Sequence, residues 1–207
     1  PDAVNVATSD MIHGFRNAMN ECFPDAITTV DKFHVVSNCE DAVDRVRRRE
    51  AASGEKRKSK ALAKTKYIWL KNDENLTEKQ KKRLDELLQI EYLDTVKAYD
   101  MRLRLQDFYS KHDAYDEKTI FDFDNMALDF CNSTISEMQK FGEMLVRNAV
   151  EILNYFETKR TNAILEGFNS KISVIKNRAI GFRNMKNFIS MIYFCCGELD
   201  ICFQPIL

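Results

Sequence analysis

Two carboxylates that lie far apart in the chain are the residues best suited to chemistry. Glu166 lies in a helical pattern near the C-terminus, and Asp10 ends a short apolar run that begins at Ala3. A hard cation such as Mg²⁺ prefers carboxylate oxygens in near-octahedral geometry, so an aspartate at a strand end facing a helix glutamate suits phosphoryl transfer. The two acids therefore predict a metal site, if the fold brings them together.

Amide side chains flank the helix glutamate. Asn162 lies four residues before Glu166 and Asn169 three residues after it, so on a helix the three share one face. An apolar stripe runs beside that face: Ile164, Leu165, Phe168, Ile172 and Ile175. A lone acid on a helix is usually solvated, but this setting makes Glu166 a better ligand candidate, with Asn162 and Asn169 in support.

The first thirty residues are typical of a strand, a helix and a second strand. We expect strands at 3–9 and 26–30 and a helix at 11–23, which together form a parallel βαβ unit. Ligands of open α/β sheets bind at the carboxyl ends of the strands. Asp31, which follows the second strand, either supports the metal site or caps the next helix. His34 either contacts a phosphate or orients a carboxylate, or it is a structural histidine bonded to backbone.

The remaining sequence predicts helices. Few Gly and Pro residues, 6 and 3, favour a mostly helical chain. Capping boxes are expected at 77–80 and 134–137, and polar breaks at 51–55 and 110–116. The expected helices run from 33 to 49, from 77 to 108, from 138 to 156, through Glu166, and from 185 to 194.

Length and composition exclude several classes of protein. The chain has 207 residues, with 44% hydrophobic and 30% charged residues, which is typical of a folded protein rather than a disordered one. Its apolar runs fall short of the roughly 20 residues that span a bilayer. None of the 6 Cys forms a C-x-x-C pair, so we expect reduced thiols rather than a zinc site.

Charge is segregated along the sequence, although the net charge is only -1. Basic residues crowd positions 45–71, and acidic residues crowd positions 107–129. This pattern fits one DNA-facing surface, and it fits two solvated helical faces equally well. Trp69, within the basic stretch, either stacks on a base or lies in the core.

Two sets of cations are candidates for phosphate contacts, which favour the bidentate geometry of Arg. The first is the run Arg47, Arg48 and Arg49, and the second is Lys171, Lys176, Arg178 and Arg183 near a glycine turn. The alternative for the second set is a helix end whose positive charge suits the helix dipole.

Four blocks in a fixed order resemble a known family. They are Asp31-Lys-Phe-His-Val-Val36, Ala42-Val-Asp-Arg-Val-Arg-Arg-Arg49, the stretch Tyr155–Lys171 around Glu166, and Gly181-Phe-Arg-Asn184. Together they are similar to the DDE transposases of bacterial insertion sequences, specifically the ISL-three group. The resemblance covers nearly the whole chain.

The resemblance implies an α/β, mostly helical chain with a partial ribonuclease-H-like fold, interrupted by an all-helical insertion. Residues 1–50 and 158–207 would form the catalytic core, and residues 51–157 the insertion. Asp10 would be the second aspartate of the triad and Glu166 its glutamate. The first aspartate matches no residue here, so we expect a C-terminal portion that is inactive alone.

The same resemblance implies cofactors and partners. The intact enzyme would use two Mg²⁺ (or Mn²⁺) ions to cleave DNA at transposon ends and join the 3′-hydroxyl to target DNA. It would be a bacterial cytoplasmic protein, associated with the nucleoid when bound to DNA, with no membrane partner. Whether it forms a homo-oligomer is left open. The alternatives are a non-catalytic helical DNA-binding or assembly module, and an inactive transposase remnant.

Overall fold

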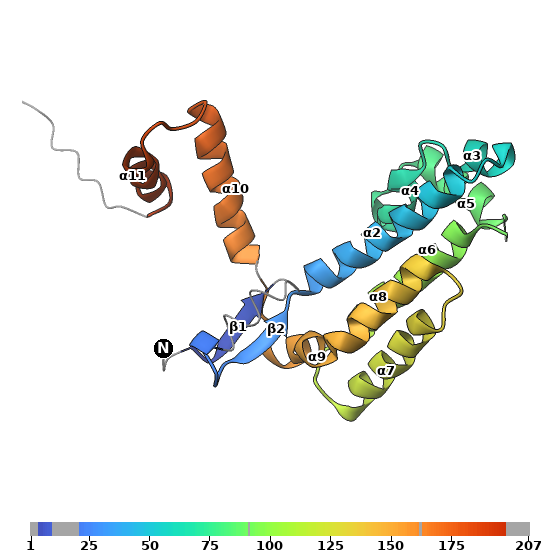
Figure 1. Ribbon diagram of the computed structural model, residues 1–207, viewed down its shortest axis with the longest axis horizontal. Coiled ribbons are helices and arrows are strands. Elements are labelled where there is room, and N and C mark those ends of the chain that lie inside the picture. Colours follow the sequence, from blue (N-terminus) through green and yellow to red (C-terminus); the bar gives the residue numbers. More distant parts are fainter. Residues whose placement is uncertain (1–3, 10–20, 91, 162, 198–207) are drawn as a thin grey trace, which may run out of the picture. The chain divides into compact units, whose positions relative to one another are not determined.

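Figure 1 shows the computed structural model, which describes residues 4–9, 21–90, 92–161 and 163–197. The side chains of residues 9 and 163–166 lie outside this description. The chain divides into two units, residues 1–160 and 161–207. The described residues are mostly helical with one small sheet, which confirms the expected mostly helical α/β class.

The sheet has two parallel strands, β1 (Val6–Ser9) and β2 (Ile27–Val30), so both predicted strands are confirmed. Val6 pairs with Ile27, and Ser9 with Val30. β-branched residues fill most of β2, as the pleated conformation favours. The helix predicted at 11–23 lies largely outside the described residues, although residues 21 and 22 are helical.

Helix α9 (Ala149–Thr158) covers β2. The Asn154 side-chain amide donates to the carbonyl of Thr28 at 2.9 Å, and the Thr29 hydroxyl donates to the carbonyl of Glu151 at 3.3 Å. These bonds satisfy polar groups along the strand and attach the helical part of the unit to the sheet.

Helix α2 (Lys32–Ala51) is the spine of the first unit and contacts α3, α4, α6, α8 and α9. Its buried face repeats with helical spacing through Val35, Cys39, Val43 and Val46, which are fully buried. The helix begins directly after β2. The sheet edge and the helical lobe are therefore joined by one continuous element.

Two short helices follow α2: α3 (Lys56–Leu62) and α4 (Lys66–Leu70). Trp69 is fully buried, and its indole Nε1 donates to the Thr65 hydroxyl at 3.1 Å, so of the two alternatives it is a core residue. A short 3₁₀ turn (Asp73–Asn75) leads to α5 (Glu78–Leu88).

The predicted capping box before α5 is confirmed, but the single helix expected from 77 to 108 is wrong. Thr77 and Gln80 make both reciprocal bonds of the box. The chain then breaks and restarts as α6 (Asp94–Lys111). The cause is a non-local cap: the buried Glu50 carboxylate accepts the amide of Asp94 at 3.0 Å, and the amide and hydroxyl of Thr95 at 2.7 Å each.

Three further helices complete the first unit: α7 (Glu117–Cys131), α8 (Ser136–Arg147) and α9. Helix α7 was not predicted. The helix expected from 138 to 156 is instead divided at Asn148, which lies between α8 and α9. The predicted cap at Thr134 is also wrong, because Ile135 holds the N-cap position and its amide bonds the Ser133 hydroxyl at 3.2 Å.

Helices α7 and α8 approach so closely that position 142 has no room for a side chain. A Cβ atom at Gly142 would lie 2.5 Å from the backbone nitrogen of Cys131 and 2.7 Å from the carbonyl carbon of Phe130. The glycine is therefore required by packing rather than by a turn.

The second unit is a pair of helices, α10 (Ala163–Arg178) and α11 (Met185–Cys196). The turn between them uses two left-handed residues, Ile180 at φ 53° and Gly181 at φ 92°. Asn184 caps α11 by accepting the amide of Lys186 at 2.9 Å, as its place before the predicted last helix suggested. None of the side chains described in residues 167–197 is buried. Across the described residues, no helix combines the length and apolar character needed to cross a membrane.

Candidate functional site

The carboxyl ends of the two strands lie side by side. Because Ser9 pairs with Val30, the strand leading to Asp10 ends beside the strand leading to Asp31. Asp10 itself lies outside the described residues, and its role as a metal ligand stays a prediction. The described part of this edge is therefore built around Asp31.

Asp31 is 3% exposed and caps α2: its Oδ1 accepts the amide of Phe33 at 2.9 Å. The capping alternative is thus realised, and it does not preclude support of a metal. The Asp31 carboxylate affects the pKa values of two tyrosines. Burial, then the nearby Tyr155 and then the Asp31 charge, raise the pKa of Tyr109 above its usual value. Burial and the same charge raise the pKa of Tyr155.

His34 lies in the first turn of α2 and is half-buried. Its ring meets the Phe33 ring edge-on, with centroids 5.8 Å apart. Its backbone carbonyl accepts the Asn38 side-chain amide at 2.8 Å. The predicted contact with a phosphate or a carboxylate stays a prediction.

Replacing Asp31 separates its two roles, capping and charge. Asp31→Asn keeps an oxygen that can cap α2 and removes the charge, whereas Asp31→Ala removes both. We expect Asp31→Ala to lower the free energy of unfolding by about 1 kcal/mol and Asp31→Asn to change it much less. Thermal unfolding measures both variants. Equal losses of stability would show that the charge, rather than the cap, stabilises this end of α2.

The second predicted ligand lies in the second unit. Glu166 is in α10, as expected, and its side chain is outside the description. Asn169 is exposed one turn later, and Asn162 lies outside the described residues. Among the described side chains, no three His, Cys, Asp or Glu residues cluster closely enough to hold a metal ion.

The three arginines predicted to contact DNA are engaged by carboxylates of the chain itself. Arg47 and Arg48 both pair with Asp44, at 2.7 and 3.1 Å. Arg49 bonds Glu137 at 2.8 Å and Asp94 at 3.2 Å. The hydrogen bond to Glu137 is the main reason that the pKa of Arg49 is raised.

The cations of the second unit are exposed. Lys171, Lys176, Arg178 and Arg183 all face solvent within that unit, and Lys171 lies 5.8 Å from the centre of the Phe168 ring. With Lys186 they make five basic residues in 167–197, a segment that contains no acidic residue. Their predicted role in DNA binding stays a prediction.

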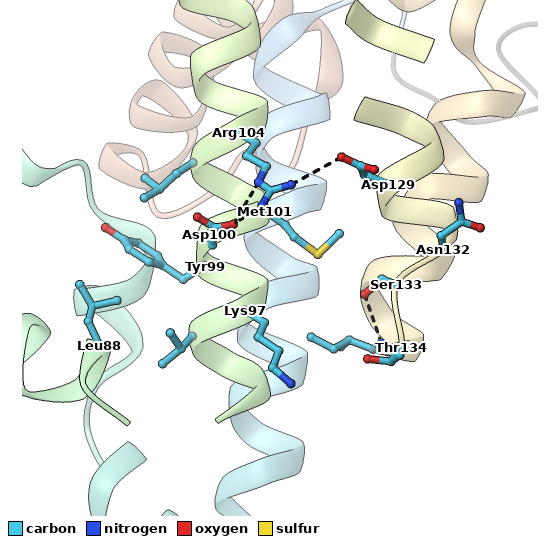
Figure 2. A pocket seen from close by; sticks show the side chains of 13 residues that line it. Leu88, Lys97, Tyr99, Asp100, Met101, Arg104, Asp129, Asn132, Ser133 and Thr134 are labelled. Atoms are coloured by element: carbon cyan, nitrogen blue, oxygen red, sulfur yellow. Dashed lines mark hydrogen bonds and ion pairs between the residues drawn. The ribbon is translucent and has the colours of Figure 1, made fainter. Parts of the chain in front are cut away.

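Two features of the first unit were not predicted. The first is a pocket of about 790 Å³ between α6 and the α7–α8 turn (Figure 2). Apolar side chains such as Leu88 and Met101 line it, and Arg104 pairs with Asp100 at 2.9 Å and with Asp129 at 3.5 Å beside it. No sequence motif marks the pocket, because its lining residues come from separate helices.

The second is a set of hydrogen bonds around His112 and Thr119 at the α6–α7 turn. The His112 ring lies 3.1 Å from an Asp122 oxygen and 3.2 Å from the Thr119 hydroxyl. That hydroxyl donates to the carbonyl of Ala114 at 2.8 Å, and Asp116 accepts the Thr119 amide at 2.7 Å. The hydrogen bonds that Asp116 accepts from Thr119, first of all from its amide, lower the pKa of the Asp116 carboxyl.

Comparisons with known proteins agree with the four sequence blocks. A family model described as a transposase matches residues 1–192. The transposase for insertion sequence element IS1001 from Bordetella parapertussis is 29% identical over 189 residues, which cover 89% of this chain and 46% of that protein. The chain thus spans about half the length of this curated relative. No solved structure matches this chain. Because the family match extends over almost the whole chain, this chain belongs to the DDE transposases of the ISL-three group.

Proposed function

We propose that this chain carries part of the active site of a DNA transposase, with Asp10 and Glu166 as metal ligands. The observation that carries the proposal is the family match, which spans both residues. The strand register supports it, since β1 and β2 end side by side just before Asp10 and Asp31. Carboxylates at such an edge are the donors that Mg²⁺ and Mn²⁺ prefer.

The residues would act as follows on a DNA phosphodiester. Asp10 and Glu166 hold divalent ions, and the buried charge of Asp31 adds to the negative field at the same sheet edge. Divalent ions held by Asp10 and Glu166 would supply positive charge that stabilises the oxygens of the reacting phosphodiester. The DNA would be a transposon end in the cleavage step and target DNA in the joining step.

The proposal assigns the segments of the chain to two structural parts. Residues 1–50 and 158–207 would belong to a ribonuclease-H-like core, and residues 51–157 to a helical insertion. The first aspartate of the family's triad matches no residue of this chain.

Metal removal tests the proposal in the full-length transposase. We expect cleavage of a labelled transposon-end duplex in Mg²⁺ or Mn²⁺, complete loss of cleavage in excess chelator, and recovery when the metal is restored. Denaturing electrophoresis of the labelled strand measures all three. Cleavage that persists in chelator would refute the metal-dependent mechanism.

A second candidate, a non-catalytic DNA-binding module, is favoured by one observation. The segment 167–197 has five basic residues, no acidic residue and no buried side chain. This candidate predicts DNA binding without cleavage under every metal condition, so the same assay separates it from the first.

A further inference from the structure

Cations in the first unit fall into two groups, those paired with carboxylates and those left without one. Residues 56–71 contain seven basic residues and no acidic residue. Lys58 pairs with Glu55 at 3.2 Å, and the Glu55 bond raises its pKa. The other six have no ion pair with any described residue; we call them the α3–α4 basic segment: Lys56, Arg57, Lys60, Lys64, Lys66 and Lys71.

The core holds this segment so that its cations face outward. Leu62, Ile68 and Trp69 are buried. The cations from Lys56 to Lys66 are exposed, and Lys71 is half-buried. Within the first unit, α3 and α4 lie near the end of α2 that is remote from β2 (Figure 1).

The arrangement is unfavourable for an isolated helix. Lys56 and Lys60 are four residues apart on one face of α3, where like charges repel. The first turn of α3 has no acidic residue and carries three cations, at the end where the helix dipole favours anions. Lys64 adopts a left-handed conformation at φ 59°, which is costly for a residue with a side chain. An external polyanion would relieve the electrostatic part of this cost.

We propose that the α3–α4 basic segment binds the phosphate backbone of double-stranded DNA. This inference rests on the proposed function, because membership in a transposase family makes DNA the polyanion that the chain meets. Regularly spaced phosphates match cations spread over sixteen consecutive residues. The segment is a better candidate for DNA contacts than Arg47, Arg48 and Arg49, because those three arginines form ion pairs with carboxylates of the chain itself.

The test compares two variants of the chain with equal charge changes. The first replaces Lys56, Lys60 and Lys64 by Gln. The control replaces Lys97, Lys118 and Lys140 by Gln; these lysines are also exposed and have no ion pair among the described residues, but lie on α6, α7 and α8. Fluorescence anisotropy measures binding to a mixed-sequence duplex of about two helical turns over a range of salt concentrations, in EDTA.

We expect the first variant to bind at least about tenfold more weakly at 0.1 M salt, with a salt slope lower by about 2 to 3, since each lost phosphate contact removes about 0.9. The control should bind like the unmodified chain. Equal weakening in both variants, no duplex binding by the unmodified chain, or tighter binding of an RNA duplex would each overturn the inference. Circular dichroism checks that both variants keep their helices.

The outcome is distinguishable from failure of the proposed function. Binding in EDTA does not depend on metal ions or on Asp10 and Glu166. If the transposase with the three lysine substitutions binds and cleaves DNA normally, only the inference about the segment is wrong. Duplex binding through the segment without any metal-dependent cleavage would sink only the proposed chemistry.

Discussion

Replacing Glu166 by Gln in the full-length transposase is expected to abolish strand cleavage while leaving DNA binding intact. The substitution keeps the size and polarity of the side chain but removes the charge that would hold a divalent ion. Without the metal ion, the charge that develops in the transition state is no longer stabilised. The activation free energy then rises by several kcal/mol, which lowers the rate about a thousandfold or more. Asp10→Asn should have the same effect. Cleavage is measured with a labelled transposon-end duplex, and DNA binding is measured by an electrophoretic mobility shift.

The matched control is Glu157→Gln, which changes an exposed glutamate of α9 in the same way. It should leave both cleavage and binding unchanged. If Glu166→Gln cleaved as well as the control, the assignment of Glu166 as a ligand would be wrong. If it also lost binding, the residue would act through structure rather than through metal.

Glu50→Ala is expected to cause the largest loss of stability among substitutions in the first unit that we consider. The Glu50 side chain is 4% exposed, and its two oxygens accept three hydrogen bonds from the start of α6. Truncation leaves these donors, at Asp94 and the fully buried Thr95, without their acceptor. Such losses cost about 1–3 kcal/mol for each buried group, so we expect a total of about 3 kcal/mol and a drop in Tm of about 6–12 °C.

Glu55→Ala provides the comparison, because Lys58 lies near both acids, 3.9 Å from Glu50 and 3.2 Å from Glu55, but Glu55 is 59% exposed. Exposed ion pairs contribute little, and this variant should change the free energy of unfolding by about 0.5 kcal/mol or less. Thermal unfolding followed by circular dichroism measures both. Similar Tm values for the two variants would mean that Glu50 does not anchor α6.

Local signals in the sequence predicted much of the fold. The strand ends before Asp31, the reciprocal bonds of Thr77 and Gln80, and the cap at Asn184 all involve residues a few positions apart, so periodicity and capping rules suffice.

The wrong single helix and the pairing of Arg49 have one physical cause, which is contact between residues distant in sequence. The apolar pattern through 77–108 fits one helix, and only Glu50, 44 positions before Asp94, divides it. Arg49 has the composition of a phosphate ligand, but Glu137, 88 positions away, binds it. The site is predicted less completely than the fold. Residue types predict Asp10 and Glu166 as ligands, but the distance between them depends on tertiary structure that no local pattern encodes.

The unbroken α2 helix sets the distance between the strand ends and the α3–α4 basic segment. Twenty residues at about 1.5 Å each make a rod of about 30 Å, with Asp31 at one end and the start of α3 beyond the other. One turn of B-form duplex is about 34 Å. Phosphates gripped beyond Ala51 would thus sit roughly one turn from the strand ends. The length of α2 would then set the distance between the DNA phosphates bound by the α3–α4 basic segment and the proposed cleavage site.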